Sequence, residues 1–227
     1  MIRVGILGST GSIGRSALEV IERHPERFQV VALSANHSAD SLAEQVQRHR
    51  PRVAVLTGGD GLVSRGDTSG TRWLEGREAL LGITEAPDVD VIVNALVGAA
   101  GLEPTLKTLL AGKRLALANK ESLVAGGDLV VEATRKGGGE LIPVDSEHSA
   151  ILQCLEGYDM ESVARLVLTA SGGPFRGWTT EQLRDAHPSK ALNHPTWSMG
   201  QKITGYPAAG CGQIQPPQAF PALGQIG

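Results

Sequence analysis

Short apolar runs alternate with amphipathic segments along most of the chain, and this alternation limits the folds that the sequence can adopt. Regular alternation is typical of βαβ units, in which parallel strands lie beneath covering helices. We therefore expect an α/β protein with a Rossmann-like, doubly wound parallel sheet. The expected strands are residues 2–7, 30–34, 52–56, 90–95, 114–118 and 140–144. The expected helices are residues 12–23, 39–49, 75–81, 102–111 and 121–135.

The remaining segments have other patterns. Residues 57–70 are rich in Gly, Ser and Asp and predict a surface loop. Another strand is expected over residues 163–170, and another helix over residues 179–186. From residue 205 onward the sequence contains four prolines and no charged residue, so we expect this tail to be disordered.

The composition excludes several classes of protein. The 227 residues have a formal net charge of -3 and 4% aromatic residues, so neither charge nor stacking surfaces favour nucleic acid as a partner. No run approaches the ~20 apolar residues that a membrane-spanning helix needs, so we expect no membrane partner. Cys154 and Cys211 form no disulfide framework, which indicates a reducing, cytoplasmic setting.

The sequence GSTGSIG occupies residues 8–14, between the first expected strand and the first expected helix. Glycines at this spacing allow a tight turn and a close approach of the backbone to a pyrophosphate, and the helix that follows offers free N–H groups. The alternative is a glycine-rich turn that only packs a helix on the sheet. The position at the first strand–helix junction favours dinucleotide binding.

The end of the second expected strand bears on which dinucleotide would bind. An NAD site usually has a carboxylate there, which bonds the ribose 2′-OH. Here Asn36, His37 and Ser38 follow the strand, and the first carboxylate is Asp40. A 2′-phosphate would meet no repulsion at this place, and His37 and Arg15 can assist it. The sequence therefore favours NADP over NAD.

Asn119, Lys120 and Glu121 follow the strand expected over residues 114–118. They fall at the edge of the sheet where ligands lie in open α/β folds, so we expect them near a substrate and a nicotinamide ring. The alternative is a helix cap with an exposed lysine.

The sequence DSEH follows the last expected strand of the sheet. If the chain is still extended there, Asp145 and Glu147 point to the same side and can hold a hard divalent cation. The alternative is an N-cap, in which Asp145 or Ser146 caps a helix over residues 148–156 and Glu147 favours the helix dipole. His148 is a candidate ligand only by proximity, and a surface histidine is the simpler interpretation.

Two later motifs remain open to two interpretations each. SGGPFR offers Ser171 and backbone amides for a phosphate, or is a plain turn. In NHPTWSMG, Trp197 on a loop indicates a lid over a bound ligand, or simple packing.

Taken together and in order, these motifs resemble those of the 1-deoxy-D-xylulose 5-phosphate reductoisomerase family. The matching stretches are GSTGSIG, ALANKES, PVDSEHSAI, ASGGPFR and HPTWSMGQKI, and the similarity spans residues 2–204. The resemblance implies isomerisation and NADPH-dependent reduction of 1-deoxy-D-xylulose 5-phosphate to 2-C-methyl-D-erythritol 4-phosphate, in the non-mevalonate isoprenoid pathway. It implies Mg²⁺, Mn²⁺ or Co²⁺ as the metal, and family members tend to form homodimers.

The resemblance also implies domains and residue roles. An NADPH-binding Rossmann-like domain would cover residues 1–139, part of an α+β catalytic domain would cover residues 140–204, and a tail outside the family would cover residues 205–227. Trp197 and Met199 would lie on a closing loop. Residues at the cofactor would be Thr10, Gly11, Ser12, Ile13, Asn36, His37, Ser38, Asn119, Glu121 and Gly200. Residues at the sugar phosphate would be Lys120, Ser146, Ser171 and His194. The metal ligands would be Asp145 and Glu147, and the catalytic group would comprise Lys120, Asp145, Glu147 and His194.

The chain departs from the family pattern in two places. Ser38 stands where the family often has Asn. After HPTWSMGQKIT the family continues with a segment that supplies three phosphate contacts and a third metal carboxylate, but here no Asp or Glu follows Asp185. This difference indicates a truncated or frame-disrupted C-terminal region, and we expect little or no turnover from the chain. The alternatives are a non-catalytic NADPH-binding remnant and another NADPH-dependent sugar-phosphate or semialdehyde dehydrogenase.

Overall fold

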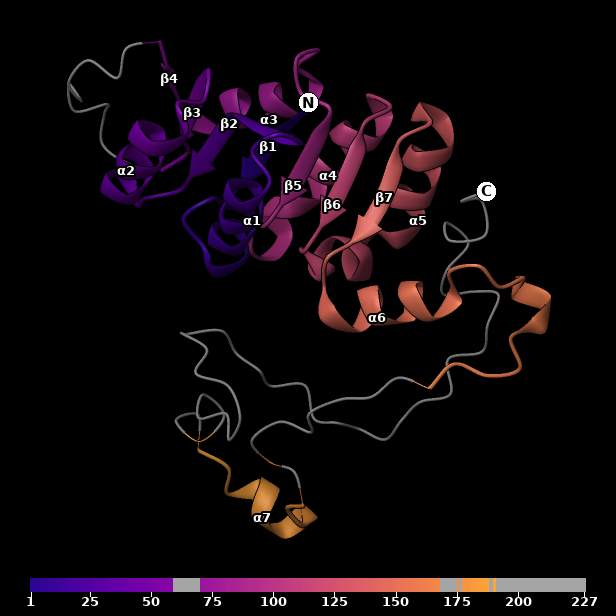
Figure 1. Cartoon of the computed structure of the whole chain (residues 1–227). Helices are drawn as coiled ribbons and strands as arrows, with labels where there is room; N and C mark the ends of the chain where they lie inside the picture. The colour runs from indigo at the N-terminus through magenta and orange to yellow at the C-terminus, as the bar shows by residue number, and fades with distance from the viewer. Residues whose placement is uncertain (59–69, 168–174, 176, 188–189, 191–227) are drawn as a thin grey trace. The chain divides into compact units, whose positions relative to one another are not determined.

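A computed structural model describes residues 1–58, 70–167, 175, 177–187 and 190 of the chain (Figure 1). It divides into two compact units. The first comprises Met1–Ser149, and the second begins at Ala150.

The first unit is built on a seven-stranded sheet in which all neighbouring strands are parallel, in the order β4-β3-β2-β1-β5-β6-β7. Both β2 and β5 pair with β1, so the sheet grows in opposite directions on the two sides of β1. The loops after β1 and β5 therefore diverge, and ligands of doubly wound sheets bind at such a point. The strands are β1 (Ile2–Leu7), β2 (Phe28–Ala35), β3 (Val53–Leu56), β4 (Arg72–Glu75), β5 (Val91–Asn94), β6 (Arg114–Leu117) and β7 (Glu140–Pro143).

Helices cover both faces of this sheet (Figure 1). Helices α1 and α2 bury Leu18 and Leu42 in one apolar core, together with Ile6 of β1. Helices α3, α4 and α5 cover a second core, which includes Leu109 of α4 and Leu7 of β1. Successive residues of β1 thus face opposite sides, as the pleat of a strand requires. The helices are α1 (Ser12–Arg23), α2 (Ala39–His49), α3 (Gly76–Glu85), α4 (Leu102–Leu110) and α5 (Lys120–Gly137), with the short 3-10 helix η1 (Gly98–Gly101).

Local sequence explains where these helices form and end. In α2 the buried residues are Leu42 and Val46, four positions apart, so the helix presents one apolar stripe to the sheet. Helix α2 is followed by Arg50 at φ 48°, and α5 by Gly138 at φ 69°. Both are left-handed conformations that end a helix, and only the glycine adopts one without a steric penalty.

The fold class, the expected strands and the expected helices of the first unit are confirmed, with small shifts at their ends. Strand β4 and the 3-10 helix η1 were not predicted from the sequence, because RWLE has two exposed residues and GAAG has no periodic pattern. The first unit continues to Ser149, past the boundary expected at residue 139, because β7 pairs with β6. The functional division at residue 139 stays a prediction.

The second unit has few regular elements among its described residues. The boundary between the units lies within α6 (Ser146–Leu155), which is followed by the 3-10 helix η2 (Met160–Ser162) and α7 (Thr180–Arg184). A capping box starts α7: the Thr179 hydroxyl accepts a hydrogen bond from the Gln182 amide, and the Gln182 side chain accepts one from the Thr179 amide. The helix expected there is confirmed.

Three other expectations have different outcomes. Residues 163–167 form no strand, which corrects that part of the strand expected over 163–170. These residues are exposed or half-buried, and none of them pairs with a strand of the sheet that the described residues form. Residues 168–170, most of the loop expected at 57–70 and the tail from 205 lie outside the described residues. Within the described part of the chain, no helix is long and apolar enough to cross a membrane.

Candidate functional site

The glycine-rich loop after β1 lies at the point where the sheet changes direction. Gly8 adopts φ 81°, and its amide donates to the Ser34 carbonyl over 3.1 Å. A Cβ on Gly8 would lie 2.8 Å from the carbonyl oxygen of Ala95, which follows β5. A Cβ on Gly14 would collide with the Gly8 carbonyl and lie 2.6 Å from Cα of Ser9. Both glycines are therefore required by close backbone packing.

The first turn of α1 is open toward a ligand. Gly11 is the N-cap residue and has no side chain with which to cap the helix, and the first turn contains no acidic residue. The N–H groups of a first turn have no acceptor within the helix and carry its positive dipole end. Ser12 and Ile13 are exposed, and Thr10 is half-buried. The structure thus brings the four loop residues from Thr10 to Ile13 to an uncapped helix N-terminus.

Gln45 of α2 holds the loop from one side, a contact that was not predicted from the sequence. The Ser9 hydroxyl donates to Oε1 of Gln45 over 2.7 Å, and Nε2 of Gln45 donates to the Ser9 carbonyl over 2.9 Å. Ser9 is fully buried. One sequence feature could have indicated this contact: Gln45 precedes Val46 on the buried stripe of α2, where a polar side chain needs a hydrogen-bond partner.

Asn36, His37 and Ser38 directly follow β2, and all three are exposed. Asn36 accepts a hydrogen bond from the Thr57 hydroxyl over 3.1 Å. A Cβ at Gly58 would lie 2.6 Å from Cε1 of His37, so the imidazole packs against the backbone after β3. Ser38 precedes α2 without capping it through its side chain. The first carboxylate, Asp40, lies within the first turn of α2, as the sequence predicts.

Asn119 follows β6 and caps α5. Its Oδ1 accepts hydrogen bonds from the Ser122 amide, at 2.9 Å, and from the Ser122 hydroxyl. Its Nδ2 donates to the carbonyls of Leu96 and Gly98, both at 2.9 Å. The side chain is buried. The helix-cap interpretation of this motif is therefore correct for Asn119, while the lysine next to it has a more specific partner.

Lys120 and Asp145 form an ion pair across the carboxyl edge of the sheet. Nζ of Lys120 lies 2.8 Å from Oδ2 of Asp145, whose side chain is only 11% exposed. The hydrogen bond to Asp145 raises the pKa of Lys120 above its ordinary value. Burial acts to raise the pKa of Asp145, but the hydrogen bond and charge of Lys120 outweigh burial, so the pKa of this carboxyl lies below its ordinary value. Both groups are therefore charged at neutral pH.

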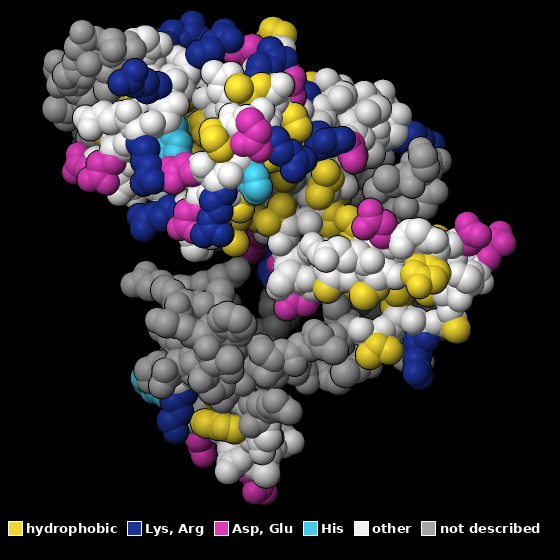
Figure 2. All heavy atoms as spheres, in the orientation of Figure 1, with side chains coloured by type: hydrophobic (Ala, Val, Ile, Leu, Met, Phe, Trp, Pro, Cys, Tyr) yellow, Lys and Arg dark blue, Asp and Glu magenta, His cyan; other side chains and the backbone are white. Residues whose placement is uncertain are grey.

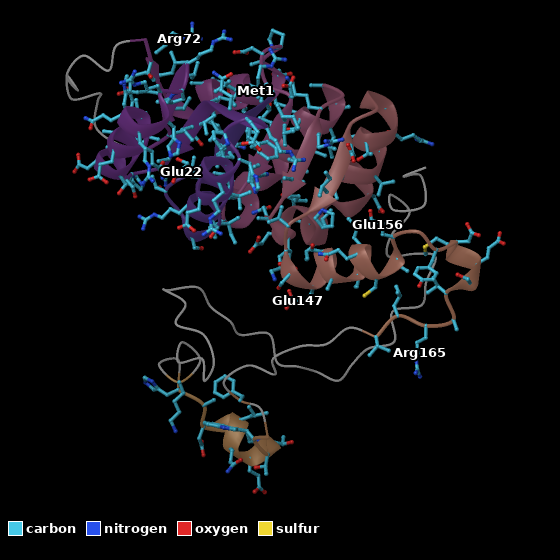
Figure 3. The ribbon with its side chains drawn as sticks, in the orientation of Figure 1. Met1, Glu22, Arg72, Glu147, Glu156 and Arg165 are labelled. Atoms are coloured by element: carbon cyan, nitrogen blue, oxygen red, sulfur yellow. The ribbon has the colours of Figure 1, made fainter. Side chains whose placement is uncertain are left out.

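Glu147, which is labelled in Figure 3, lies in the first turn of α6. The chain is not extended there: Asp145 precedes the helix, and its carbonyl accepts from the Ser149 amide over 2.8 Å. The alternation argument for Asp145 and Glu147 is therefore wrong, and the helix start is correct. The Ser146 hydroxyl donates to Oε2 of Glu147 over 2.8 Å, and Nδ1 of His148 lies 3.6 Å from Oδ1 of Asp145. Among the described residues, no three His, Cys, Asp or Glu side chains form a group that could hold a metal.

Glu121 lies half-buried in the first turn of α5. The other expected site residues lie outside the described residues, and their roles stay predictions. They are Ser171, His194, Trp197, Met199 and Gly200.

The fold and the site together define a Rossmann-like α/β protein, with a glycine-rich loop and a lysine–aspartate pair at the carboxyl edge of its sheet. A sequence model of 1-deoxy-D-xylulose 5-phosphate reductoisomerase matches residues 4–127, and a model of the C-terminal domain of the same enzyme matches residues 141–209. The chain belongs to the 1-deoxy-D-xylulose 5-phosphate reductoisomerase family.

Curated relatives and solved structures agree with this assignment. A reductoisomerase of Geotalea uraniireducens is 49% identical over 207 residues, covering 90% of this chain and 54% of the relative. One of Nocardia farcinica is 53% identical over 202 residues, covering 88% of this chain and 49% of the relative. The chain thus spans about half the length of the curated relatives it matches.

Two solved structures of reductoisomerases have the same fold. The structure from Zymomonas mobilis in complex with NADPH has a TM-score of 0.78 and 40% identity, covering 86% of this chain and 52% of the other. A second, in complex with NADPH, fosmidomycin and magnesium, has a TM-score of 0.77 and 40% identity, covering 89% of this chain and 53% of the other.

Proposed function

We propose that this chain forms the NADPH-binding part and the first half of the metal site of a 1-deoxy-D-xylulose 5-phosphate reductoisomerase. The whole enzyme would convert its sugar-phosphate substrate to 2-C-methyl-D-erythritol 4-phosphate for isoprenoid synthesis. The observation that carries this proposal is the position of the glycine-rich loop and the Lys120–Asp145 pair, both at the carboxyl edge of one parallel sheet. Family membership does not favour a different sugar-phosphate or semialdehyde dehydrogenase.

The residues present fit NADPH. The uncapped first turn of α1 supplies N–H groups for a pyrophosphate, and Gly8 and Gly14 allow the close backbone packing of the loop before this turn. At the end of β2, the exposed Asn36, His37 and Ser38 place no carboxylate against a 2′-phosphate. These features support NADPH over NADH, with the adenosine half at β2 and the nicotinamide half toward β5 and β6.

The residues present also fit part of a divalent metal site. Asp145 and Glu147 are hard oxygen donors of the kind that Mg²⁺, Mn²⁺ and Co²⁺ accept, and they are separated by one residue. In the structure Oδ2 of Asp145 is engaged by Lys120, so a cation would compete with this ammonium for the carboxylate. We propose these two carboxylates as protein ligands, and a third donor is not among the described residues.

The chemistry of the chain's own residues follows from these positions. Lys120 is charged and would hold an oxygen of the sugar phosphate, and Ser146 would donate or accept a hydrogen bond beside it. Ser171 and His194 would bind the substrate by motif resemblance, and Trp197 and Met199 would cover it. A bound divalent cation would polarise the ketone and its neighbouring hydroxyl as a Lewis acid. NADPH would supply the hydride.

Two further parts of the proposal concern the setting of the chain. Cys154 is a free, exposed thiol, which supports a reducing, cytoplasmic compartment. Homodimer formation is proposed from the family resemblance alone.

The experiment that tests the proposal is performed on the purified chain. NADPH binding is followed by its fluorescence, with NADH as the matched control, and NADPH oxidation is followed after addition of 1-deoxy-D-xylulose 5-phosphate and Mn²⁺. We expect NADPH to bind more tightly than NADH, with little or no oxidation. Metal-dependent oxidation would contradict the expected loss of turnover, and failure to bind NADPH would overturn the proposed function.

A further inference from the structure

Five residues at the switch point of the sheet form a closed ring of hydrogen bonds. Nδ2 of Asn94 donates to the Thr105 hydroxyl over 3.0 Å, and that hydroxyl lies 3.4 Å from the Ser122 hydroxyl. The Ser122 hydroxyl donates to Oδ1 of Asn119, and Nδ2 of Asn119 donates to the Leu96 carbonyl over 2.9 Å. The Leu96 amide closes the ring by donating to Oδ1 of Asn94 over 3.2 Å.

Every step of this ring is chemically consistent. Each hydroxyl accepts one hydrogen bond and donates the next, so the donors run in one direction from Asn94 to Asn119. The side chains of Asn94, Thr105 and Ser122 are fully buried, and that of Asn119 is 1% exposed. Buried hydrogen bonds of this kind are costly to leave unmade, so loss of one member is felt by its neighbours.

The ring joins elements that are far apart in the sequence. Asn94 ends β5, Thr105 lies in α4, and Asn119 and Ser122 form the start of α5. Leu96, in the turn after β5, is held at both its amide and its carbonyl. A Cβ at Gly101 would collide with the Asn119 amide, so this glycine provides the space that the amide occupies.

The ring contacts two segments of the candidate site, the turn after β5 and the first turn of α5. The turn after β5 packs against the glycine-rich loop, because the Ala95 carbonyl faces Gly8 and the Ala95 amide donates to the Leu7 carbonyl over 2.9 Å. Lys120, which pairs with Asp145, follows Asn119 directly. The side chain of Asn119 is itself saturated by four hydrogen bonds, so it has no donor or acceptor left for a ligand.

We infer that this ring is a positioning device, which sets the turn after β5 and the first turn of α5 for the nicotinamide half of the cofactor. Asn94, Thr105, Ser122 and the Asn119 side chain are positioning residues that act through Leu96 and Lys120. The inference rests on the proposed function for the identity of the ligand, and on the structure alone for the bracing of the two turns.

The test compares two buried threonines of α4. Thr105→Val removes a hydroxyl from the ring, whereas Thr108→Val removes one that donates only to the Pro104 carbonyl of its own helix, over 2.7 Å. Both hydroxyls are fully buried, so each change replaces a buried hydroxyl by a methyl group, and only Thr105→Val affects the ring. The probes are NADPH and 2′,5′-ADP, which contains only the adenosine half.

We expect Thr105→Val to weaken NADPH binding by about 5- to 10-fold, since the ring loses the hydrogen bond that the Thr105 hydroxyl accepts from Asn94 and the one that it donates to Ser122. We expect its affinity for 2′,5′-ADP to stay within about two-fold, and Thr108→Val to leave both affinities within about two-fold. Thr105→Ser keeps the hydroxyl and should restore NADPH binding. Equal weakening of both ligands by Thr105→Val, or unchanged NADPH binding, would overturn the inference.

A second measurement does not depend on the ligand. Hydrogen exchange of the Leu96 and Ser122 amides reports the bracing directly, because both amides donate to side chains of the ring. We expect faster exchange at both amides in Thr105→Val and in Ser122→Ala, but not in Thr108→Val. If the wild-type chain fails to bind NADPH, the proposed function fails and exchange alone decides the inference: unchanged protection at both amides overturns it.

Discussion

Nζ of Lys120 lies 2.8 Å from Oδ2 of Asp145, so the first residue of α5 is tied to the residue that precedes α6. This pair occupies a carboxylate that the proposed metal would need. The Lys120 ammonium and a metal cation would weaken each other's binding to Oδ2 of Asp145, because two positive charges at such a short separation repel each other. The Lys120 ammonium therefore competes with a cation for this proposed ligand.

The competition predicts the effect of neutralising the lysine. We expect Lys120→Gln to increase the affinity of the chain for Mn²⁺ by about three- to ten-fold, because a partly exposed ion pair is worth on the order of 1 kcal/mol. Isothermal titration with Mn²⁺ measures the change. Lys107→Gln, which breaks the Lys107–Glu85 pair on the surface, is the matched control and should leave the affinity unchanged. Weaker Mn²⁺ binding by Lys120→Gln would mean that the ammonium supports the site and does not compete for it.

The surroundings of Gly14 in α1 and Gly82 in α3 predict opposite effects on stability when each glycine is replaced by alanine. We expect Gly14→Ala to destabilise the chain by about 2 kcal/mol or more and to abolish NADPH binding, because the added Cβ would collide with the Gly8 carbonyl. Gly82 lies exposed in α3 with no atom within 4 Å of an added Cβ, so Gly82→Ala should stabilise the chain by about 0.5–1 kcal/mol. Urea unfolding and NADPH fluorescence measure both. Retained NADPH binding by a folded Gly14→Ala chain would contradict the close packing of the loop.

The parts of the fold that could be predicted from sequence are those with a local pattern. The strand IRVGIL and the helix that begins at Ser12 are visible because apolar spacing changes from continuous to helical at the GSTGSIG sequence. The RWLE strand has no such pattern, since it lies at the edge of the sheet and half of its residues are exposed. Its pairing with β3 is a tertiary effect that overrides local preference.

The candidate site divides in a similar way. Lys120 and Asp145 could be expected at one edge of the sheet, because each follows a parallel strand. The conformation at Glu147 could not, since a strand end and a helix start compete over the same four residues and only packing decides between them. Gln45 and Thr105 were missed because each looks like an ordinary polar residue within a helix. Their roles depend on partners in other elements, Ser9 and Asn94, and no sequence spacing identifies such partners.

A buried histidine predicts one pH dependence of stability. His49 ends α2 with its side chain 9% exposed, 3.2 Å from Glu22 of α1, which Figure 3 labels. Burial lowers the pKa of His49. The charge of Glu22 acts to raise this pKa, and the charge of Arg48 acts to lower it further. Because the folded pKa lies below the ordinary value of 6.5, the unfolded chain takes up the proton more readily, and stability should fall as the pH drops below 6.5.

The measurement is urea unfolding from pH 7 to pH 5. His49→Gln should reduce the loss of stability over this range, by on the order of 1 kcal/mol or less. His24→Gln, at an exposed position, is the matched control. An unchanged slope in His49→Gln would mean that Glu22 offsets the effect of burial.

Acidic and basic side chains lie next to one another over the visible surface of the first unit (Figure 2). We expect one ion pair, Arg3 with Asp90, to contribute most to how the stability of the chain changes at acidic pH. Arg3 of β1 donates through its backbone amide to Oδ2 of Asp90 over 2.8 Å, and through Nε to the same oxygen over 3.0 Å. These bonds, first from the side chain and then from the backbone, lower the pKa of Asp90 to about 2 from its ordinary value of 3.8. The contribution is therefore present above pH 3.8 and is lost as the pH falls through about 2.

We expect Asp90→Asn to lower the free energy of unfolding at pH 7 by about 1 kcal/mol, a value reduced from the full linkage because the Asp90 side chain is 39% exposed. The difference between Asp90→Asn and wild type should shrink from pH 4 toward pH 2, where the wild-type carboxyl also becomes neutral. Urea unfolding at several pH values measures it. Glu132→Gln, which breaks an exposed pair with Lys136 one turn along α5, is the matched control and should have a smaller effect. A constant difference across this range would show that Asp90 acts by packing and not by its charge.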